Sequence, residues 1–70
     1  MKHREFEDRI KLIKPGDLVK LTCRGNYGNY LTEGVLQKVE NGRIYFRHGS
    51  SHHYKRILEI IIVHIEVKFA

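Results

Sequence analysis

A chain of 70 residues can form one small domain, and its net charge of +5 favours an anionic partner such as nucleic acid or an acidic protein surface. One cysteine, Cys23, excludes an internal disulfide and is typical of a reducing compartment, so we expect a cytoplasmic protein. The longest apolar run, Ile60–Val63, is far shorter than the about 20 residues of a membrane-spanning helix, and the charged first residues do not resemble a secretory signal.

The first predicted element is a helix over residues 3–14. Phe6, Ile10 and Ile13 recur at the i, i+4 and i+7 spacing of one helical face. Acidic residues lie toward its start and lysines toward its end, which complements the helix dipole. Pro15 and Gly16 then predict the end of the helix.

The period of apolar residues changes to two after this helix. Residues 17–23 predict a first strand in which Val19, Leu21 and Cys23 share one face. Residues 24–30 are rich in turn-forming residues and predict a loop. A second strand is expected over residues 31–40.

A hairpin turn is predicted at Asn41-Gly42, because these residue types accept the positive φ angles of a type I′ turn. The third strand would then cover residues 43–47, with Ile44 and Phe46 on one face. The opposite face would carry Arg43, Tyr45 and Arg47.

The remainder is predicted as a polar loop over residues 48–53, followed by the most β-prone stretch, residues 54–69. Odd positions are apolar from Ile61 onward, but the pattern breaks near Ile57–Glu59, where we expect a turn or bulge between a short fourth strand and a long fifth one. The fold class is therefore mainly β. We predict a single domain over residues 1–70, with a helix at about 3–14 and a five-stranded antiparallel small barrel at about 17–69.

Three short segments resemble known small barrels. The segment Gly34–Glu40 resembles the glycine-led second strand of Sm proteins, and Tyr54–Ile57 is similar to the Tyr-Lys-His segment of the bacterial Sm-like RNA chaperone. Gly16–Val19, together with Gly34-Val35, resembles the Gly-Asp-x-Val opening and later Gly-x-Val of KOW-type barrels. These resemblances imply an SH3-like or Sm-like barrel that binds RNA or DNA.

Cations and aromatic residues gather in two segments that suit nucleic-acid binding. Residues 41–58 contain no acidic side chain, and the 24–30 segment carries two tyrosines and an arginine. Cations contact phosphates, and aromatic rings stack on unpaired bases. The predicted site comprises Arg24, Tyr27, Tyr30, Arg43, Tyr45, Arg47, His48, His52, Tyr54, Lys55 and Arg56.

Metal, cofactor and catalytic sites are not expected. His48, His52 and His53 lie close in sequence, but a structural zinc site needs four ligands and the one cysteine is remote from them. Cys23 belongs to an apolar strand face, where a thiol is usually inert. No nucleophile has an evident base and orienting group, so we do not expect an enzyme.

Two functional hypotheses remain open. The favoured one is a non-enzymatic nucleic-acid-binding small barrel, with RNA favoured over DNA. The alternative is a protein-interaction or assembly module that forms a homo-oligomer or pairs through the C-terminal strand, Ile60–Phe69. A membrane-surface role is ranked last, since the helix mixes acids with bases.

Overall fold

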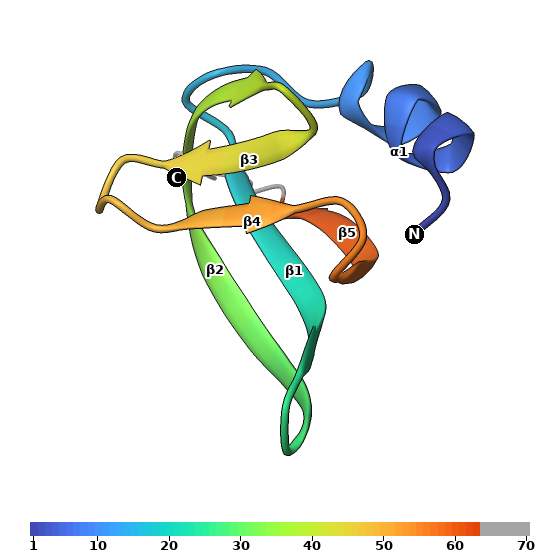
Figure 1. The fold of residues 1–70 in the computed structure, drawn as a ribbon. Helices are drawn as coiled ribbons and strands as arrows, with labels where there is room; N and C mark the ends of the chain where they lie inside the picture. Colours follow the sequence, from blue (N-terminus) through green and yellow to red (C-terminus); the bar gives the residue numbers. More distant parts are fainter. Residues whose placement is uncertain (64–70) are drawn as a thin grey trace, which may run out of the picture.

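A computed structural model describes residues 1–63 of the chain. It contains one helix and five strands: α1 (His3–Ile10), β1 (Leu18–Gly25), β2 (Gly28–Glu40), β3 (Arg43–Phe46), β4 (Ser51–His53) and β5 (Ile57–Val63) (Figure 1). The predicted fold class, mainly β with an N-terminal helix and a five-stranded antiparallel sheet, is confirmed. The part of the predicted last strand beyond residue 63 lies outside the described residues. Within them, no helix is long and apolar enough to cross a membrane.

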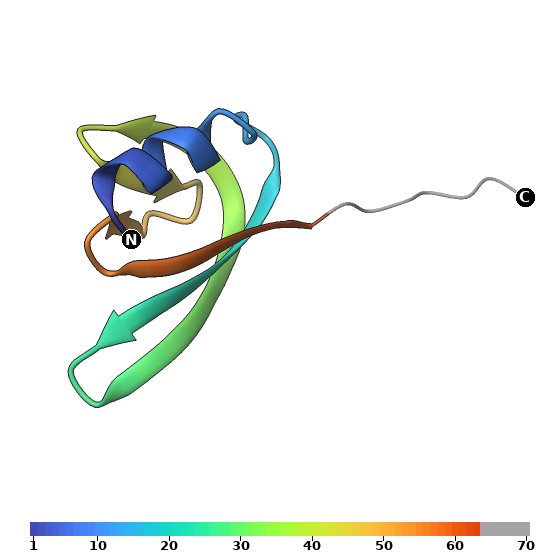
Figure 2. The ribbon, with the colours of Figure 1, turned by 90° about the vertical axis from the view of Figure 1, so that its right-hand side faces the viewer.

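The five strands form one curled sheet in the order β4-β3-β2-β1-β5. Strand β2 is long enough to pair with β1 through its first part and with β3 through its last part, and it bends between them (Figure 2). Its register with β3 shifts between Leu36 and Lys38, which is the signature of a bulge. Among the described residues, β4 and β5 each pair on one side only, so hydrogen bonds do not close the predicted barrel.

The core forms where the alternating apolar faces meet. Val19, Leu21 and Cys23 of β1 all point inward, as their spacing predicts. Ile44 and Phe46 of β3 also point into the core. Together with α1 and β5 they make a buried cluster of Phe6, Ile13, Val19, Leu21, Cys23, Leu36, Ile44, Phe46 and Ile57. Burial of this cluster is the main favourable contribution to folding.

The helix is shorter than predicted and ends at Ile10. The amides of Leu12 and Ile13 donate to carbonyls three residues back instead of four, which tightens the chain out of the α-helix. Asp17 then closes a turn, because its side chain accepts a hydrogen bond from the Lys14 amide at 3.0 Å. This tighter path still buries Ile13, so the apolar spacing was correct although the helix end was wrong.

The two hairpin turns differ in how well they were predicted. Asn41 and Gly42 have φ angles of 51° and 73°, which confirms the type I′ turn. The predicted loop over residues 24–30 is wrong. Gly25 pairs with Gly28, which leaves a two-residue turn at Asn26-Tyr27 and extends both strands into a projecting hairpin.

The chain after β3 also departs from the prediction. The expected loop over residues 48–53 is wrong in part, because residues 51–53 form β4 against β3. The expected fourth strand is replaced by a turn at residues 54–56. The predicted break in period is a bulge at Leu58, since Cys23 pairs with Ile57 and Thr22 with Glu59. It lies inside β5 and does not separate two strands.

Candidate nucleic-acid interface

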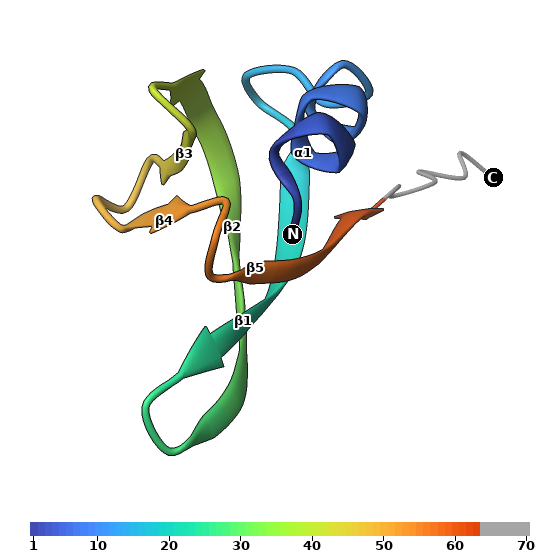
Figure 3. The same cartoon turned by 45° about the vertical axis from the view of Figure 1, so that its right-hand side comes forward.

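The structure divides ten of the eleven predicted site residues into three groups, and the eleventh, Lys55, is exposed in the turn at residues 54–56. The first group gathers at the end of the β1–β2 hairpin, which projects from the body of the domain (Figure 3). We call Arg24, Tyr27, Tyr30 and Arg56 the hairpin-tip cluster. An open hollow of about 490 Å³ lies here, lined by residues 25–30 and Arg56. Its lining contains no carboxylate.

Backbone hydrogen bonding holds the hairpin-tip cluster together. The Arg24 amide donates to the Arg56 carbonyl at 2.7 Å, which fixes the turn before β5 against the hairpin. Tyr27 is fully exposed at the turn, and Tyr30 is 41% exposed opposite Cys23. Both tyrosine rings and the Arg56 side chain therefore share one surface, whereas Arg24 pairs with Asn29 and its side chain stands on the opposite face of the hairpin from Tyr30.

The second group lies on the outer face of β3. Arg43 is exposed and Tyr45 is half-buried, while Arg47 lies just beyond the strand end and is exposed. Lys38 of β2 lies over the Tyr45 ring, with its Nζ atom 4.9 Å from the ring centroid. The predicted platform therefore carries an additional cation, and one face of Tyr45 is occupied by it.

Lys38 was absent from the prediction, although the Asn41-Gly42 turn could have revealed it. The turn sets Glu40 opposite Arg43, and Lys38 opposite Tyr45. Lys38 Nζ also lies 2.8 Å from Glu40 Oε2. This hydrogen bond and the opposite charges raise the pKa of Lys38 and lower the pKa of Glu40. Lys38 is thus partly neutralised as a phosphate ligand.

His53 joins this outer face through its pairing with Arg43. Partial desolvation and the charges of Arg43 and Lys55 lower the pKa of His53. The two cations contribute to this shift after desolvation. The register of β3 with β4 was the missing signal for His53, and it could not be read from a segment predicted as a loop.

The third group is His48, His52 and Tyr54, whose rings lie against buried aromatic residues, although His48 itself remains exposed. The His52 ring lies 5.7 Å from Phe46, and its Nδ1 atom is 4.0 Å from Cys23 Sγ. Burial, followed by the charge of His48, lowers the pKa of His52. The His52 Nε2 atom is buried without a hydrogen-bond partner in the described part of the chain.

His48 and Tyr54 each pack on an aromatic residue of the core. The His48 ring lies 5.4 Å from Phe46, and its Nε2 atom is 2.6 Å from the Ser50 hydroxyl. Tyr54 lies 5.4 Å from Phe6 of α1, which it helps to hold in place. The three residues of this group do not gather with the other predicted site residues into one open surface.

The charges of the two outer surfaces are largely uncompensated. Within residues 1–63, the ion pairs involve His3, Lys11, Lys20 and Lys38. None of the five cations of the predicted site forms an ion pair with a described carboxylate: Arg24, Arg43, Arg47, Lys55 and Arg56. These side chains can bind phosphate without first breaking an internal pair.

The described residues offer no three-ligand cluster of the kind that could hold a metal ion. Burial raises the pKa of the Cys23 thiol, which an interaction with Tyr30 partly offsets. The thiolate is therefore disfavoured. Comparison with protein-family models, curated proteins and solved structures found no significant match.

Proposed function

We propose that this protein is a non-enzymatic binder of single-stranded nucleic acid, with RNA favoured over DNA. The observation that carries the proposal is the hairpin-tip cluster. It combines a fully exposed tyrosine, Tyr27, with a second partly exposed one, Tyr30. Arg56 lines the same hollow and Arg24 lies on the other face of the hairpin, both without a described carboxylate partner.

The chemistry of this surface suits unpaired bases. Aromatic rings stack on any exposed base, with about 1–3 kcal/mol per base measured by alanine substitution in other proteins. Guanidinium groups bind phosphate oxygens through charged hydrogen bonds. The amides of Asn26 and Asn29 line the same hollow and supply donors and acceptors for base edges. In a duplex the bases already stack on one another, so the tyrosines favour single strands.

The order of the elements supports an SH3-like or Sm-like barrel as the finer fold. Helix α1 precedes five strands, and only a three-residue turn at 54–56 separates β4 from β5. This order resembles that of Sm proteins, in which a short turn joins the fourth and fifth strands. The resemblance of the Tyr54–Ile57 segment to the Sm-like RNA chaperone is the reason for favouring RNA.

Fluorescence anisotropy with labelled single-stranded RNA, single-stranded DNA and a duplex tests the proposal. We expect the single strands to bind more tightly than the duplex, and affinity to fall steeply with salt. No binding to any of these at about 50 mM salt would overturn the proposal.

Replacement of Tyr27 examines the stacking directly. Tyr27→Ala is expected to weaken binding by about tenfold or more, whereas Tyr27→Phe, which keeps the ring, retains most of the affinity. Because the side chain is fully exposed, neither change removes a core contact. Equal losses in both variants would assign the effect to the hydroxyl group and contradict stacking.

An assembly module remains the second candidate, favoured by the edge of β5. In the described residues this strand pairs with β1 alone, and its sequence contains neither proline nor lysine. Edges of this kind are templates for pairing with another strand. A strictly monomeric protein that captures no strand-forming peptide would refute this candidate.

A further inference from the structure

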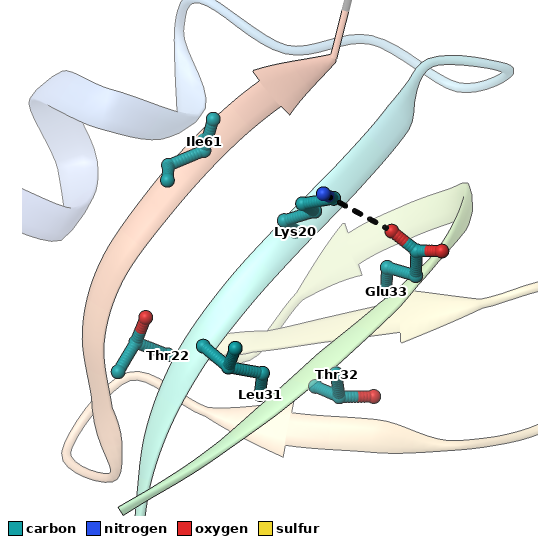
Figure 4. A pocket seen from close by; sticks show the side chains of 6 residues that line it. All are labelled: Lys20, Thr22, Leu31, Thr32, Glu33 and Ile61. Carbon is teal, nitrogen blue, oxygen red and sulfur yellow. Dashed lines mark ion pairs between the residues drawn. The ribbon is translucent and has the colours of Figure 1, made fainter.

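The outer face of strands β2, β1 and β5 carries an apolar groove that shares no lining residue with the hollow at the hairpin tip. Lys20 and Thr22 of β1 lie at its centre, between lining residues of β2 and Ile61 of β5 (Figure 4). The groove has a volume of about 440 Å³ and is lined by Lys20, Thr22, Leu31, Thr32, Glu33 and Ile61.

Strand register sets the composition of this face. Thr22 lies beside Leu31 of β2, and Lys20 lies beside Ile61 of β5. Leu31 is 81% exposed and Ile61 is 45% exposed. In the next row, Leu18 lies between Val35 and Val63, all three only partly buried. This row carries apolar side chains across three strands, and the Lys20–Glu33 pair lies between it and Leu31.

The charge of this face differs from that of the whole protein. Lys20 Nζ lies 3.8 Å from Glu33 Oε2, and Glu59 stands beside Thr22 in the neighbouring row. Arg24 lies on the same face of β1 one row beyond Thr22, so that two cations and two carboxylates leave this face neutral in a chain of net charge +5. A neutral face gives nucleic acid and anionic membranes no net attraction.

We propose that a second copy of this chain covers the face in a two-fold symmetric dimer. A two-fold interface requires a surface that complements itself. Leu31 is exposed at the edge of the groove that it lines, so that the Leu31 side chain of each copy can enter the groove of the other. Lys20 and Glu33 also lie side by side, so that each can pair with its opposite in the other copy.

Dimerisation through this face also answers a stability problem. A 70-residue chain buries a small core, which rarely supplies more than about 3–5 kcal/mol by itself. Covering Leu31 and Ile61 would add apolar burial that the single chain lacks. The inference is independent of nucleic-acid binding, since the groove shares no residue with the hairpin-tip cluster.

The first test is the mass of the full chain in solution by sedimentation equilibrium. We expect a species of twice 8.3 kDa at about 100 μM protein. Leu31→Lys should weaken the dimer at least about tenfold, because it places a charge in the groove. Gln37→Lys is the matched control, since Gln37 is also an exposed residue of β2 but does not line the groove. It should leave the dimer intact.

A mixing experiment tests the identity of the partner. Lys20→Glu sets carboxylate against carboxylate across the dimer, and Glu33→Lys sets ammonium against ammonium, so each variant alone should be monomeric. In an equal mixture the opposite charges meet again, and a heterodimer should form. Circular dichroism checks that both variants are folded.

The outcomes separate this dimer from the alternatives. A wild-type monomer, or a mixture that stays monomeric while both variants are folded, overturns the proposal. A dimer that survives Leu31→Lys also overturns it and assigns assembly to the β5 edge, because Leu31 lies on β2. Loss of the dimer in Leu31→Lys with recovery in the charge-swapped mixture supports it.

Discussion

Replacing Arg24 and Arg56 together with glutamine should reduce the salt dependence of nucleic-acid binding. Both side chains are exposed and form no ion pair with a described residue, so the change removes charge without breaking a contact within that part of the chain. The hydrogen bond that joins the two residues is made by their backbone atoms and survives the substitution. The fold around the hairpin-tip cluster is therefore expected to persist.

The size of the effect follows from the number of uncompensated cations. On single strands, each phosphate contact contributes about 0.7 to the slope of log affinity against log salt concentration. The five lysines and arginines of the predicted site would give a slope of about −3.5 if all engage, and the double variant would give about −2.1. Affinity at low salt should fall in parallel, since fewer counterions are released.

Anisotropy titrations of a labelled single-stranded RNA at several salt concentrations measure this slope. Replacing Arg4 and Arg9 of α1 with glutamine is the control, because it removes the same charge from two exposed arginines elsewhere. That control should leave the slope near the wild-type value. An unchanged slope in the Arg24/Arg56 variant, or an equal reduction in the control, would refute the assignment of phosphate contacts to the hairpin tip.

Two further predictions concern the fold. A Cβ atom at Gly34 would lie 2.9 Å from Cγ of the fully buried Phe46 and 2.7 Å from His48 Cε1. Gly34→Ala should therefore destabilise the domain by about 1–3 kcal/mol and lower its melting temperature by at least about 5 °C in a thermal melt. An equal or higher melting temperature would contradict this steric argument. Burial lowers the pKa of His52 below its ordinary value of 6.5, so the unfolded chain binds a proton on this ring more readily than the folded chain does. The neutral ring contributes its full stability above pH 6.5, and this stability is lost as the pH falls through the lowered pKa. Urea unfolding at about pH 7.5 and about pH 5 should show this loss, and His52→Gln should reduce it; equal losses in both proteins would show that other groups are responsible.

Local signals accounted for the parts of the fold that were predicted correctly. The alternation of Val19, Leu21 and Cys23 identified the buried face of β1, since successive side chains of a strand point to opposite faces. Asn41-Gly42 located its turn through backbone preference alone. Pro15 predicted that the helix stops, although the tighter turn before it decided the last helical residue.

Non-local pairing decided what the sequence pattern missed. Residues 51–53 are a serine and two histidines with weak strand preference, and they form β4 because β3 offers a partner. The same pairing turns His52 inward against Cys23, whereas its neighbour His53 stands beside Arg43 on the outer face. A loop prediction carries no register and could not separate these two side chains.

By itself, the sequence determined the fold class, the alternating faces and the segments in which cations and tyrosines gather. These properties depend on residue type and on near neighbours along the chain. Only the tertiary structure decided which of those residues share a surface. The backbones of Arg24 and Arg56 meet because a hydrogen bond joins the end of β1 to the turn before β5. Leu31 of β2 and Ile61 of β5 line one groove because β2, β1 and β5 pair in register. Both depend on contacts between segments far apart in sequence, which no local pattern specifies.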